Sequence, residues 1–381
     1  MRGSVIKRGG TWSVVIDLGR DGSGQRVRKW HSGFGTRREA ERARVELLGR
    51  VDQGSYVSPS RTSLGSFLID EWLPAKRTTV KPTTLASYDM HVTKHIEPRL
   101  GGVALLGLGA GHLNAFYADL LTDGRRTGPG GLSPSSVRRV HATLHKALAD
   151  AVRWGRLARN PADQADPPRA VAAEMSVWSG EQLRAFLDSV RSDRLFAAWL
   201  TAATTGMRRG ELLGLRWSDV DLEAATLSVR QIRTVARYEV LTLTPKTDKG
   251  VRTIALDPQT VAGLRSYRVA QMEERLLLGA GYANSEDLVF TRADGSAIHP
   301  ERFSSWFRQH RRRSGLPTVR LHDVRHSYVT ALLGQGVALK VVSQRIGHAS
   351  PMVTMAIYQH VLPGDDRAAA AAGARAILGD G

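Results

Sequence analysis

Apolar residues recur along this chain in two rhythms, a short strand-like one at the beginning and a helical one over most of the rest. The first part holds three short apolar-rich runs of strand length, separated by glycine-containing turns, at residues 5–7, 12–18 and 25–31. Thr36 then opens a helical pattern that ends near Gly49, and Glu39 completes a capping box with it. The pattern predicts a small β-β-β-α domain over residues 1–58.

Helical periodicity dominates the next stretch, which follows a polar linker at residues 58–63. Proline and glycine mark its breaks and divide it into predicted helices at residues 64–76, 83–97, 112–123 and 134–156. We therefore expect a helical domain over residues 62–160. The segment at residues 159–173 is rich in proline and alanine and is typical of an interdomain linker.

The last part of the chain mixes both patterns and predicts an α+β domain over residues 174–370, followed by a tail at residues 371–381. Predicted helices at 181–190 and 195–205 lead into predicted strands at residues 226–233, 238–243 and 251–256. Helices fill most of the remainder. The chain of 381 residues is thus expected to be a multidomain, mainly α protein with small β-sheets.

Basic residues outnumber acidic ones, with 54 Lys and Arg against 36 Asp and Glu, a net charge of +18 and a pI near 10.8. Residues 1–60 carry 12 basic and 6 acidic residues, and residues 61–170 carry 15 and 9. A chain this basic is typical of proteins that bind a polyanion, and nucleic acid is the first candidate. Ordinary solvated surfaces are the alternative, although successive basic segments favour contact with DNA along the chain.

Several functional classes are disfavoured by what the sequence lacks. Because it has no cysteine, it has no disulfide framework, no thiolate nucleophile and no Cys-based zinc site. It has no apolar run of about 18 residues and no signal-peptide core, so we expect an intracellular protein with no membrane partner. A P-loop motif is also absent, so nothing indicates the use of ATP.

Histidines four residues apart are the one pattern that suggests a metal, and they occur at His91/His95, His141/His145 and His322/His326. On a helix this spacing places both rings on one face, which suits zinc. None of the pairs has the H-E-x-x-H form, and no cysteine completes a tetrad. We therefore expect no metal site and no cofactor.

Candidate chemistry gathers in residues 321–361. His322 and Arg325 are followed by His348, and then by Tyr358 in a short predicted helix that Ser350-Pro351 opens. A lone tyrosine on a helix is usually a core residue. Here its neighbours suit a phosphate, because arginine offers a planar fork of donors and histidine donates or carries a proton. A tyrosine hydroxyl beside such a clamp is a candidate covalent nucleophile.

A second motif lies upstream, where Thr205-Gly206 precedes Arg208 and Glu211 in the stretch TGMRRGELLGLRWSD. With both motifs in view, the chain resembles the tyrosine recombinase (phage integrase) family. That family carries TG-x-R-x-x-E-L-x-x-L-x-W-x-D, a lysine on a β-turn, H-x-x-R, G-H and a tyrosine. Its six catalytic positions have matches here in the same order, at Arg208, Lys246, His322, Arg325, His348 and Tyr358.

The resemblance implies a role for each of these residues. The two arginines would grip the scissile phosphate as charge develops in the transition state, and His348 would donate to a non-bridging oxygen. Lys246 would protonate the leaving 5′ oxygen, and His322 would act as general acid or base or orient the phosphate. Glu211 would hold Arg208 or His322 in place. The tyrosine would carry a 3′-phosphotyrosyl link, which conserves bond energy without ATP or metal.

The resemblance also assigns DNA-binding roles to the first two domains. Residues 1–58 would be an arm-type DNA-binding domain whose sheet presents Arg26, Arg28 and Trp30 on one face, toward a major groove. Residues 62–160 would be a SAM-like core-binding domain. Its expected phosphate contacts are Lys81, Lys94, Arg138, Arg139 and Lys146. The alternatives are solvated surface charges and tryptophans that pack on the helix.

These features predict a site-specific DNA recombinase that integrates or excises a mobile element. Its expected partners are double-stranded DNA at core and arm attachment sites, other copies in a homotetramer on DNA, and accessory bending or directionality proteins. We expect it in the bacterial cytoplasm, associated with the nucleoid, with its tail docked on a neighbouring protomer. The alternatives are a Xer-type dimer resolvase with the same chemistry, which residues 1–58 count against, and a non-cleaving DNA-binding regulator.

Overall fold

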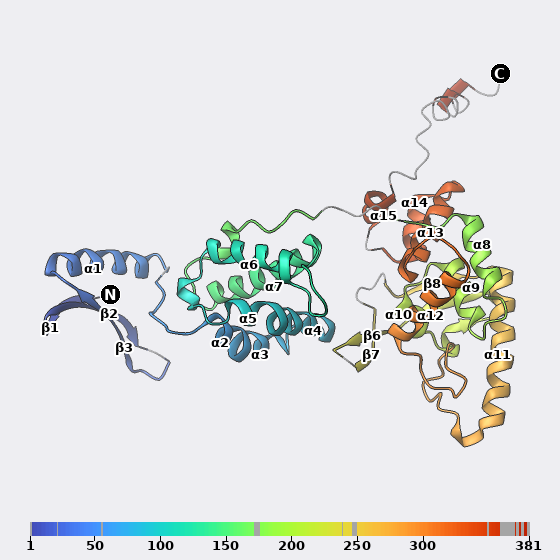
Figure 1. Cartoon of the computed structure of the whole chain (residues 1–381), viewed down its shortest axis with the longest axis horizontal. Helices are drawn as coiled ribbons and strands as arrows, with labels where there is room; N and C mark the ends of the chain where they lie inside the picture. The colour runs from blue at the N-terminus through green and yellow to red at the C-terminus, as the bar shows by residue number, and fades with distance from the viewer. Residues whose placement is uncertain are drawn as a thin grey trace. The chain divides into compact units, whose positions relative to one another are not determined.

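The computed structural model describes residues 2–20, 22–54, 56–170, 176–237, 239–245, 250–348 and 350–358, together with a few positions of the tail, 370, 373–374 and 377–378. The chain divides into two compact units, 1–172 and 173–381 (Figure 1). The first unit holds a small sheet with one helix and then a helical bundle. The second holds the later helices of the chain together with several short strands.

The N-terminal sheet is antiparallel in the order β1-β2-β3 and packs on one helix. Its elements are β1 (Arg2–Arg8), β2 (Thr11–Arg20), β3 (Arg26–Phe34) and α1 (Arg37–Asp52). Val14 and Ile16 of β2 meet Ala40 of α1 in the core. The capping box is present, since the Glu39 amide donates to Thr36 Oγ1 at 3.2 Å. The predicted β-β-β-α order is confirmed, and the strands are somewhat longer than predicted.

The outer face of this sheet carries the three side chains expected there. Arg26, Arg28 and Trp30 alternate with half-buried neighbours along β3 and are all exposed. Asp17 of β2 lies between the two arginines, with its Oδ2 at 2.9 Å from Arg26 Nε and 3.9 Å from Arg28 Nε. Trp12, in contrast, is half-buried and packs with the core beneath α1. Trp30 is the more exposed of these two tryptophans, and the Arg8 guanidinium lies 5.3 Å from the centroid of its ring.

The helical domain follows the predicted pattern, with two of its helices interrupted by π-helical turns. Its elements are α2 (Leu64–Ser66), η1 (Phe67–Trp72), α3 (Leu73–Lys76), α4 (Pro82–His91), η2 (Val92–Ile96), α5 (Glu97–Leu100), η3 (Leu105–Gly107), α6 (Ala110–Asp123), α7 (Pro134–Arg153) and η4 (Pro161–Gln164). Ala162 of η4 is buried in the bundle core. The segment predicted as a linker from residue 159 therefore begins as part of the bundle.

A buried carboxylate ties the helices of this domain together. Asp150 accepts hydrogen bonds from Trp72 Nε1 at 2.9 Å and Lys146 Nζ at 2.9 Å, and Lys76 Nζ lies 2.6 Å from it. Burial alone would raise the pKa of Asp150, but the hydrogen bonds from the two lysines lower it to about 2. Lys146, expected to contact DNA, is therefore engaged in an internal ion pair.

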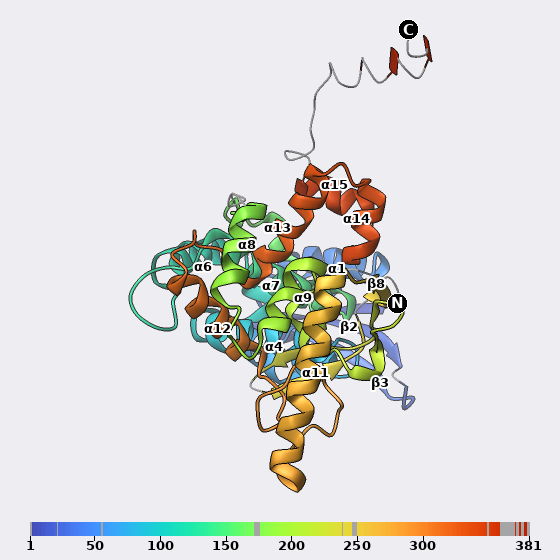
Figure 2. The same cartoon turned by 90° about the vertical axis from the view of Figure 1, so that its right-hand side faces the viewer.

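The second unit is built on a core of aromatic and aliphatic side chains. Its helical elements are α8 (Gly180–Ser189), α9 (Phe196–Thr205), α10 (Arg209–Leu213), η5 (Trp217–Asp219), α11 (Pro258–Leu278), η7 (Gly279–Gly281), α12 (Pro300–Arg313), α13 (Leu321–Gly334), α14 (Leu339–Ile346) and α15 (Pro351–Tyr358). Trp199 of α9 stacks on Phe303 of α12, with ring centroids 4.3 Å apart. The long helix α11 packs beside α9 (Figure 2).

The strands of this unit form two small sheets, and one strand prediction is wrong. They are β4 (Val220–Asp221), β5 (Thr226–Val229), β6 (Ile232–Ala236), β7 (Glu239–Leu243) and β8 (Arg252–Ala255), in the orders β4-β5-β8 and β6-β7. Residues 226–233 were expected to be one strand but belong to both sheets. The break follows from close packing on α10, because Gln231 Nε2 donates to the Gly214 carbonyl at 2.9 Å. A Cβ at Gly210 would lie 2.7 Å from the Arg233 carbonyl oxygen.

Candidate active site

The turn between α9 and α10 places Arg208. Gly206 ends α9 with a φ of +62°, and a Cβ there would lie 2.7 Å from Tyr328 Cδ1, so both the backbone and the packing require glycine. Arg208 is the N-cap residue of α10, and Glu211 occupies the N3 position. The Glu211 carboxylate accepts the Arg208 amide at 2.9 Å and Arg208 Nη1 at 2.9 Å. The local sequence thus fixes the arginine against its own helix.

Arg325 of α13 brings a second guanidinium to the same place. Its Nη1 donates to the Gly206 carbonyl at 2.7 Å and its Nη2 to the Ile346 carbonyl at 2.6 Å. Arg208 Nη1 reaches the same Ile346 oxygen at 3.4 Å. Desolvation, followed by repulsion from Arg208, lowers the pKa of Arg325 to about 9, so it stays charged at pH 7. Two adjacent guanidinium groups of this kind suit an anion with several acceptor oxygens.

A third arginine, Arg252 of β8, completes the arrangement and was not expected from the sequence. It donates to both carboxylate oxygens of Glu211, at 3.1 and 2.9 Å, and its Nε donates to the Arg345 carbonyl at 2.8 Å. Burial alone would raise the pKa of Glu211, but Arg252 and Arg208 hold it below its ordinary value. Glu211 therefore holds Arg208 and Arg252 in place. Its side chain forms no hydrogen bond with His322 in the described structure.

Two expected histidines lie around this pair. His322 occupies the first turn of α13, and His348 follows α14, which Gly347 ends with a φ of +67°. His348 Nδ1 is 2.8 Å from Thr354 Oγ1. Desolvation is the first cause that lowers the pKa of both rings to about 4, and positive charges nearby, Arg325 among them, add to it. Both rings are therefore neutral at pH 7 in the free protein.

Tyr358 ends α15 and is almost completely buried, with 1% of its surface exposed. It packs with Val329 and Ile346, as a core residue would, and its hydroxyl forms a hydrogen bond with His326 Nδ1. Desolvation raises the pKa of Tyr358 to about 12, and the charge of Arg325 opposes this only in part. The hydroxyl thus keeps its proton at pH 7. The only sequence signal for His326 was its position one turn after His322.

Lys246 lies outside the described residues, which stop at Pro245 and resume at Gly250. These two flanking residues lie close together, because a Cβ at Gly250 would be 2.6 Å from Pro245 Cβ. The Gly250 carbonyl also accepts Arg252 Nη1 at 3.2 Å. Gly250, where the described residues resume after Lys246, therefore contacts the arginine that holds Glu211.

The other expected DNA contacts of the helical domain lie at its surface. Lys81, Lys94, Arg138 and Arg139 are exposed, and Arg138 Nη1 donates to the Pro168 carbonyl at 3.4 Å. Across the described part of the chain, no three His, Asp or Glu side chains are grouped so as to hold a metal ion. Within the same residues, no helix has both the length and the apolarity to cross a membrane.

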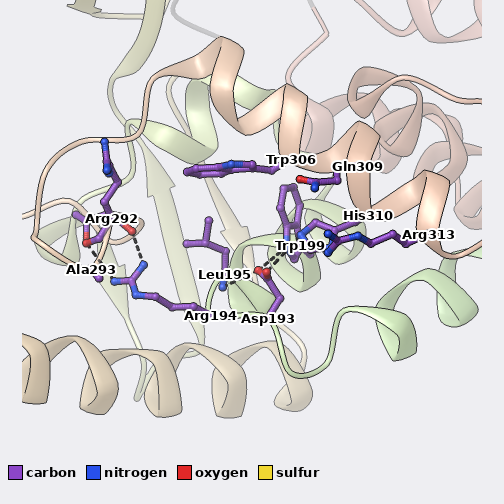
Figure 3. Close-up of a pocket in the computed structure, with 11 residues that line it drawn as sticks. Asp193, Arg194, Leu195, Trp199, Arg292, Ala293, Trp306, Gln309, His310 and Arg313 are labelled. Atoms are coloured by element: carbon purple, nitrogen blue, oxygen red, sulfur yellow. Dashed lines mark hydrogen bonds and ion pairs between the residues drawn. The ribbon is translucent and has the colours of Figure 1, made fainter.

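A separate pocket of about 390 Å³ lies between the start of α9 and α12 (Figure 3). Its inner charges are paired within the protein. Arg194 Nη2 donates to Glu274 Oε2 at 2.6 Å, and His310 Nε2 is 3.2 Å from Asp193 Oδ2. Trp199 Nε1 donates to the same aspartate at 3.0 Å. This pocket shares no residue with the arginine pair.

Three family models match the chain in order along its length. The Arm DNA-binding domain matches residues 4–51, and the Phage integrase, N-terminal SAM-like domain matches residues 66–121. The Phage integrase family matches residues 178–364. Each match falls within one of the predicted domains.

Curated relatives resemble the chain over nearly its whole length. The Tyrosine recombinase XerC-like protein of Caldanaerobacter subterraneus subsp. tengcongensis is 30% identical over 371 residues, which cover 92% of this chain and 93% of the relative. The ICEBs1 integrase of Bacillus subtilis is 27% identical over 357 residues, which cover 93% of this chain and 94% of the relative.

Solved structures share the fold. The Tn1549 transposon integrase in complex with transposon right end DNA matches with a TM-score of 0.68 and 19% identity, over 82% of this chain and 99% of that one. A lambda integrase dimer bound to a COC′ core site matches with a TM-score of 0.55 and 17% identity, over 93% of both chains.

Proposed function

The chain belongs to the phage integrase family of tyrosine recombinases, and on that premise we propose that it integrates and excises a mobile element through a covalent link between DNA and Tyr358. The observation that carries the proposal is the convergence of Arg208 and Arg325 on the Ile346 carbonyl, close to His348 and the tyrosine-bearing helix. Two buried or half-buried guanidinium groups match the oxygens of a phosphodiester.

The proposed reaction has two balanced steps. The Tyr358 oxygen attacks the scissile phosphorus, the bond from phosphorus to the 5′ oxygen breaks, and a 3′-phosphotyrosyl ester forms. The leaving 5′ oxygen takes a proton from Lys246. The 5′ hydroxyl of a second strand then returns a proton to Lys246 and attacks the ester, and Tyr358 leaves by taking back the proton that it gave to His322 in the first step. Because one ester replaces another at each step, the exchange needs no external energy source.

The side chains around the phosphate divide the remaining work. Arg208 and Arg325 stabilise the charge that develops on the non-bridging oxygens, and His348 donates to one of them. His322 accepts or returns the tyrosine proton or orients the phosphate. Glu211 holds Arg208 in place, together with Arg252. Before attack, the Tyr358 hydroxyl has to leave His326, its partner in the free protein.

The remaining proposals concern partners. Residues 1–58 bind arm sites through Arg26, Arg28 and Trp30, and residues 62–160 bind the core site. The recombining species is a homotetramer on DNA, assisted by bending or directionality proteins in the bacterial cytoplasm, at the nucleoid. The match to an arm domain favours this account over a Xer-type dimer resolvase. A non-cleaving regulator is disfavoured because each described catalytic position holds the residue type that the family uses.

A nicked suicide substrate that carries the element's attachment region tests the proposal. Wild type should become covalently attached to it, because the short cleaved strand diffuses away and blocks the reverse step. Tyr358→Phe removes one oxygen and should bind the DNA without attachment. Tyr282→Phe is the matched control, since that hydroxyl lies 3.5 Å from Thr291 Oγ1, outside the candidate active site, and the variant should react as wild type does. Attachment of the Tyr358→Phe variant would contradict the assignment.

A further inference from the structure

One buried arginine of the second unit has, within the described residues, neither a side-chain hydrogen bond nor an ion pair. Arg311 of α12 is 9% exposed, and its Nε has no hydrogen-bond partner. Among the residues that the structure describes, its guanidinium also forms no ion pair. Arg233 shows the contrast, because its Nε is equally unpartnered while its Nη1 bonds to Glu286 at 2.8 Å. A buried donor of a charged side chain that lacks a partner is costly to the free protein, and a ligand within reach of Arg311 would offset that cost.

Arg311 lines a cavity of about 480 Å³ between α12 and the start of α13. Ser304 and Arg308 share its face of α12, at spacings of seven and three residues. Arg209 and Arg320 also line the cavity, but each has an acidic partner. Arg209 pairs with Glu301 at 3.1 Å, and Arg320 pairs with Asp323 at 2.8 Å. In the described structure Arg308 and Arg311 therefore supply the unpaired positive charge.

The cavity adjoins the candidate active site. His322 lines the cavity and lies at the N-terminal end of α13, the helix that carries Arg325. Arg209 lines it too and directly follows Arg208 in the chain. A ligand in the cavity would thus sit next to a phosphate held by Arg208 and Arg325. None of the residues that line the pocket in Figure 3 has a buried side-chain nitrogen or oxygen without a partner.

We propose that this cavity binds a second backbone phosphate of the DNA, close to the scissile phosphate, and that Arg311 is its main ligand with Arg308 beside it. The proposal rests on the proposed function, because it assumes DNA at the active site. A phosphodiester supplies the oxygens that a guanidinium fork bonds in pairs. DNA is favoured over a free anion because His322 and Arg209 line the cavity and place it beside the residues proposed to hold the scissile phosphate.

The first test compares Arg311→Met with Arg312→Met in the full-length protein. Both lose one positive charge from the same turn of α12, but Arg312 is exposed and does not line the cavity. Without DNA, Arg311→Met should melt at the wild-type temperature or above it, because the variant buries no unpaired charge. With DNA, it should bind more weakly, and the slope of log affinity against log salt should fall by about 0.9. Arg312→Met should keep the wild-type slope.

The second test locates the phosphate. Methylphosphonates, which are neutral, are placed one at a time along both strands around the cleavage point. We expect one position, besides the scissile phosphate, at which a methylphosphonate weakens DNA binding by wild type and by Arg312→Met. At the same position the methylphosphonate should not weaken binding by Arg311→Met, because that variant has already lost the contact. Uniform losses for Arg311→Met at every position, together with a lower melting temperature, would show a purely structural arginine and overturn the proposal.

Inorganic phosphate distinguishes the source of the ligand. If it raises the melting temperature of wild type and not of Arg311→Met, while the methylphosphonate scan shows no discrete position, the cavity binds a free anion and the DNA assignment is wrong. The proposed function fails by a separate result, the absence of a covalent adduct with the suicide substrate. A wild type that forms the adduct but shows no Arg311-dependent position would overturn this inference alone.

Discussion

Replacement of Glu211 by glutamine is the perturbation whose effect the structure defines best. The Glu211 side chain is 3% exposed and bonds to Arg208 and Arg252, and the Arg252 side chain is 7% exposed. Glutamine preserves the shape and one acceptor oxygen but turns an NH₂ group toward a guanidinium donor. The change leaves Arg252 without a counter-charge, close to Arg208 and Arg325. Breaking a buried pair in this way costs about 3–5 kcal/mol of unfolding free energy.

Glu223→Gln provides the matched control in the same unit. The Glu223 side chain is 89% exposed and pairs with Arg265 at 2.6 Å. An exposed pair contributes about 0–1 kcal/mol, because solvent screens it. The comparison therefore separates the effect of a buried charge from the effect of the chemical change itself.

Hydrogen exchange suits this measurement, because a chain of several domains does not unfold in one step. Peptides from α9 and α11 should lose protection in Glu211→Gln by an amount that corresponds to 3–5 kcal/mol, about the value for a broken buried pair. Glu223→Gln should stay within about 1 kcal/mol of wild type. Equal protection in the two variants would refute the view that the Glu211 carboxylate stabilises the fold by pairing with Arg208 and Arg252.

The pH dependence of this contribution has a definite sign. Arg252 and Arg208 lower the folded pKa of Glu211 below its ordinary value of 4.5. The stabilisation is therefore complete above that value and is lost as pH falls through the lowered folded pKa. At pH 7, where the exchange experiment is performed, the full effect is present.

Three further predictions concern catalysis and binding. Arg208→Lys and Arg325→Lys keep the charge but lose the planar fork, so single-turnover cleavage should fall about 100-fold or more while DNA binding changes little; near wild-type rates would remove that arginine from the clamp. Arg26→Ala in the full chain should relax sequence preference at an arm site by about 1–3 kcal/mol in a competition footprint, whereas equal losses on all sequences would indicate a non-specific contact. DNA binding at pH 6 should be accompanied by proton uptake, because the scissile phosphate raises the pKa of His322 and His348 from about 4. Calorimetry in buffers of different ionisation enthalpy measures this uptake, and His348→Gln should take up fewer protons than wild type.

Local signals in the sequence predicted much of the architecture. The Thr36–Glu39 capping box marked α1, and proline and glycine breaks marked the helices of the bundle. The elements before Arg208 were also predictable, since an apolar helix followed by Gly206 gives α9 and its end. These features depend on residues close together in the chain, so periodicity and capping rules apply to them.

Contacts between distant segments were not predictable in the same way. Arg252 lies 41 residues from Glu211, and no short motif connects them. His326 is 32 residues from Tyr358, and only the packing of α15 brings the ring to the hydroxyl. The split of the strand at residues 226–233 has the same origin, because Gly210 in α10 and Gly214 directly after it admit the backbone at Arg233 and Gln231. In each case tertiary packing decides what local propensity leaves open.

The covalent residue itself can be identified by mass spectrometry, and this tests the central claim most directly. Wild type trapped on the suicide substrate is digested with protease and nuclease, and the peptide that carries a nucleotide remnant is sequenced. The account predicts a single modified residue, Tyr358, among the eight tyrosines of the chain. A remnant on any other residue, or a trapped complex with no modified tyrosine, would contradict it.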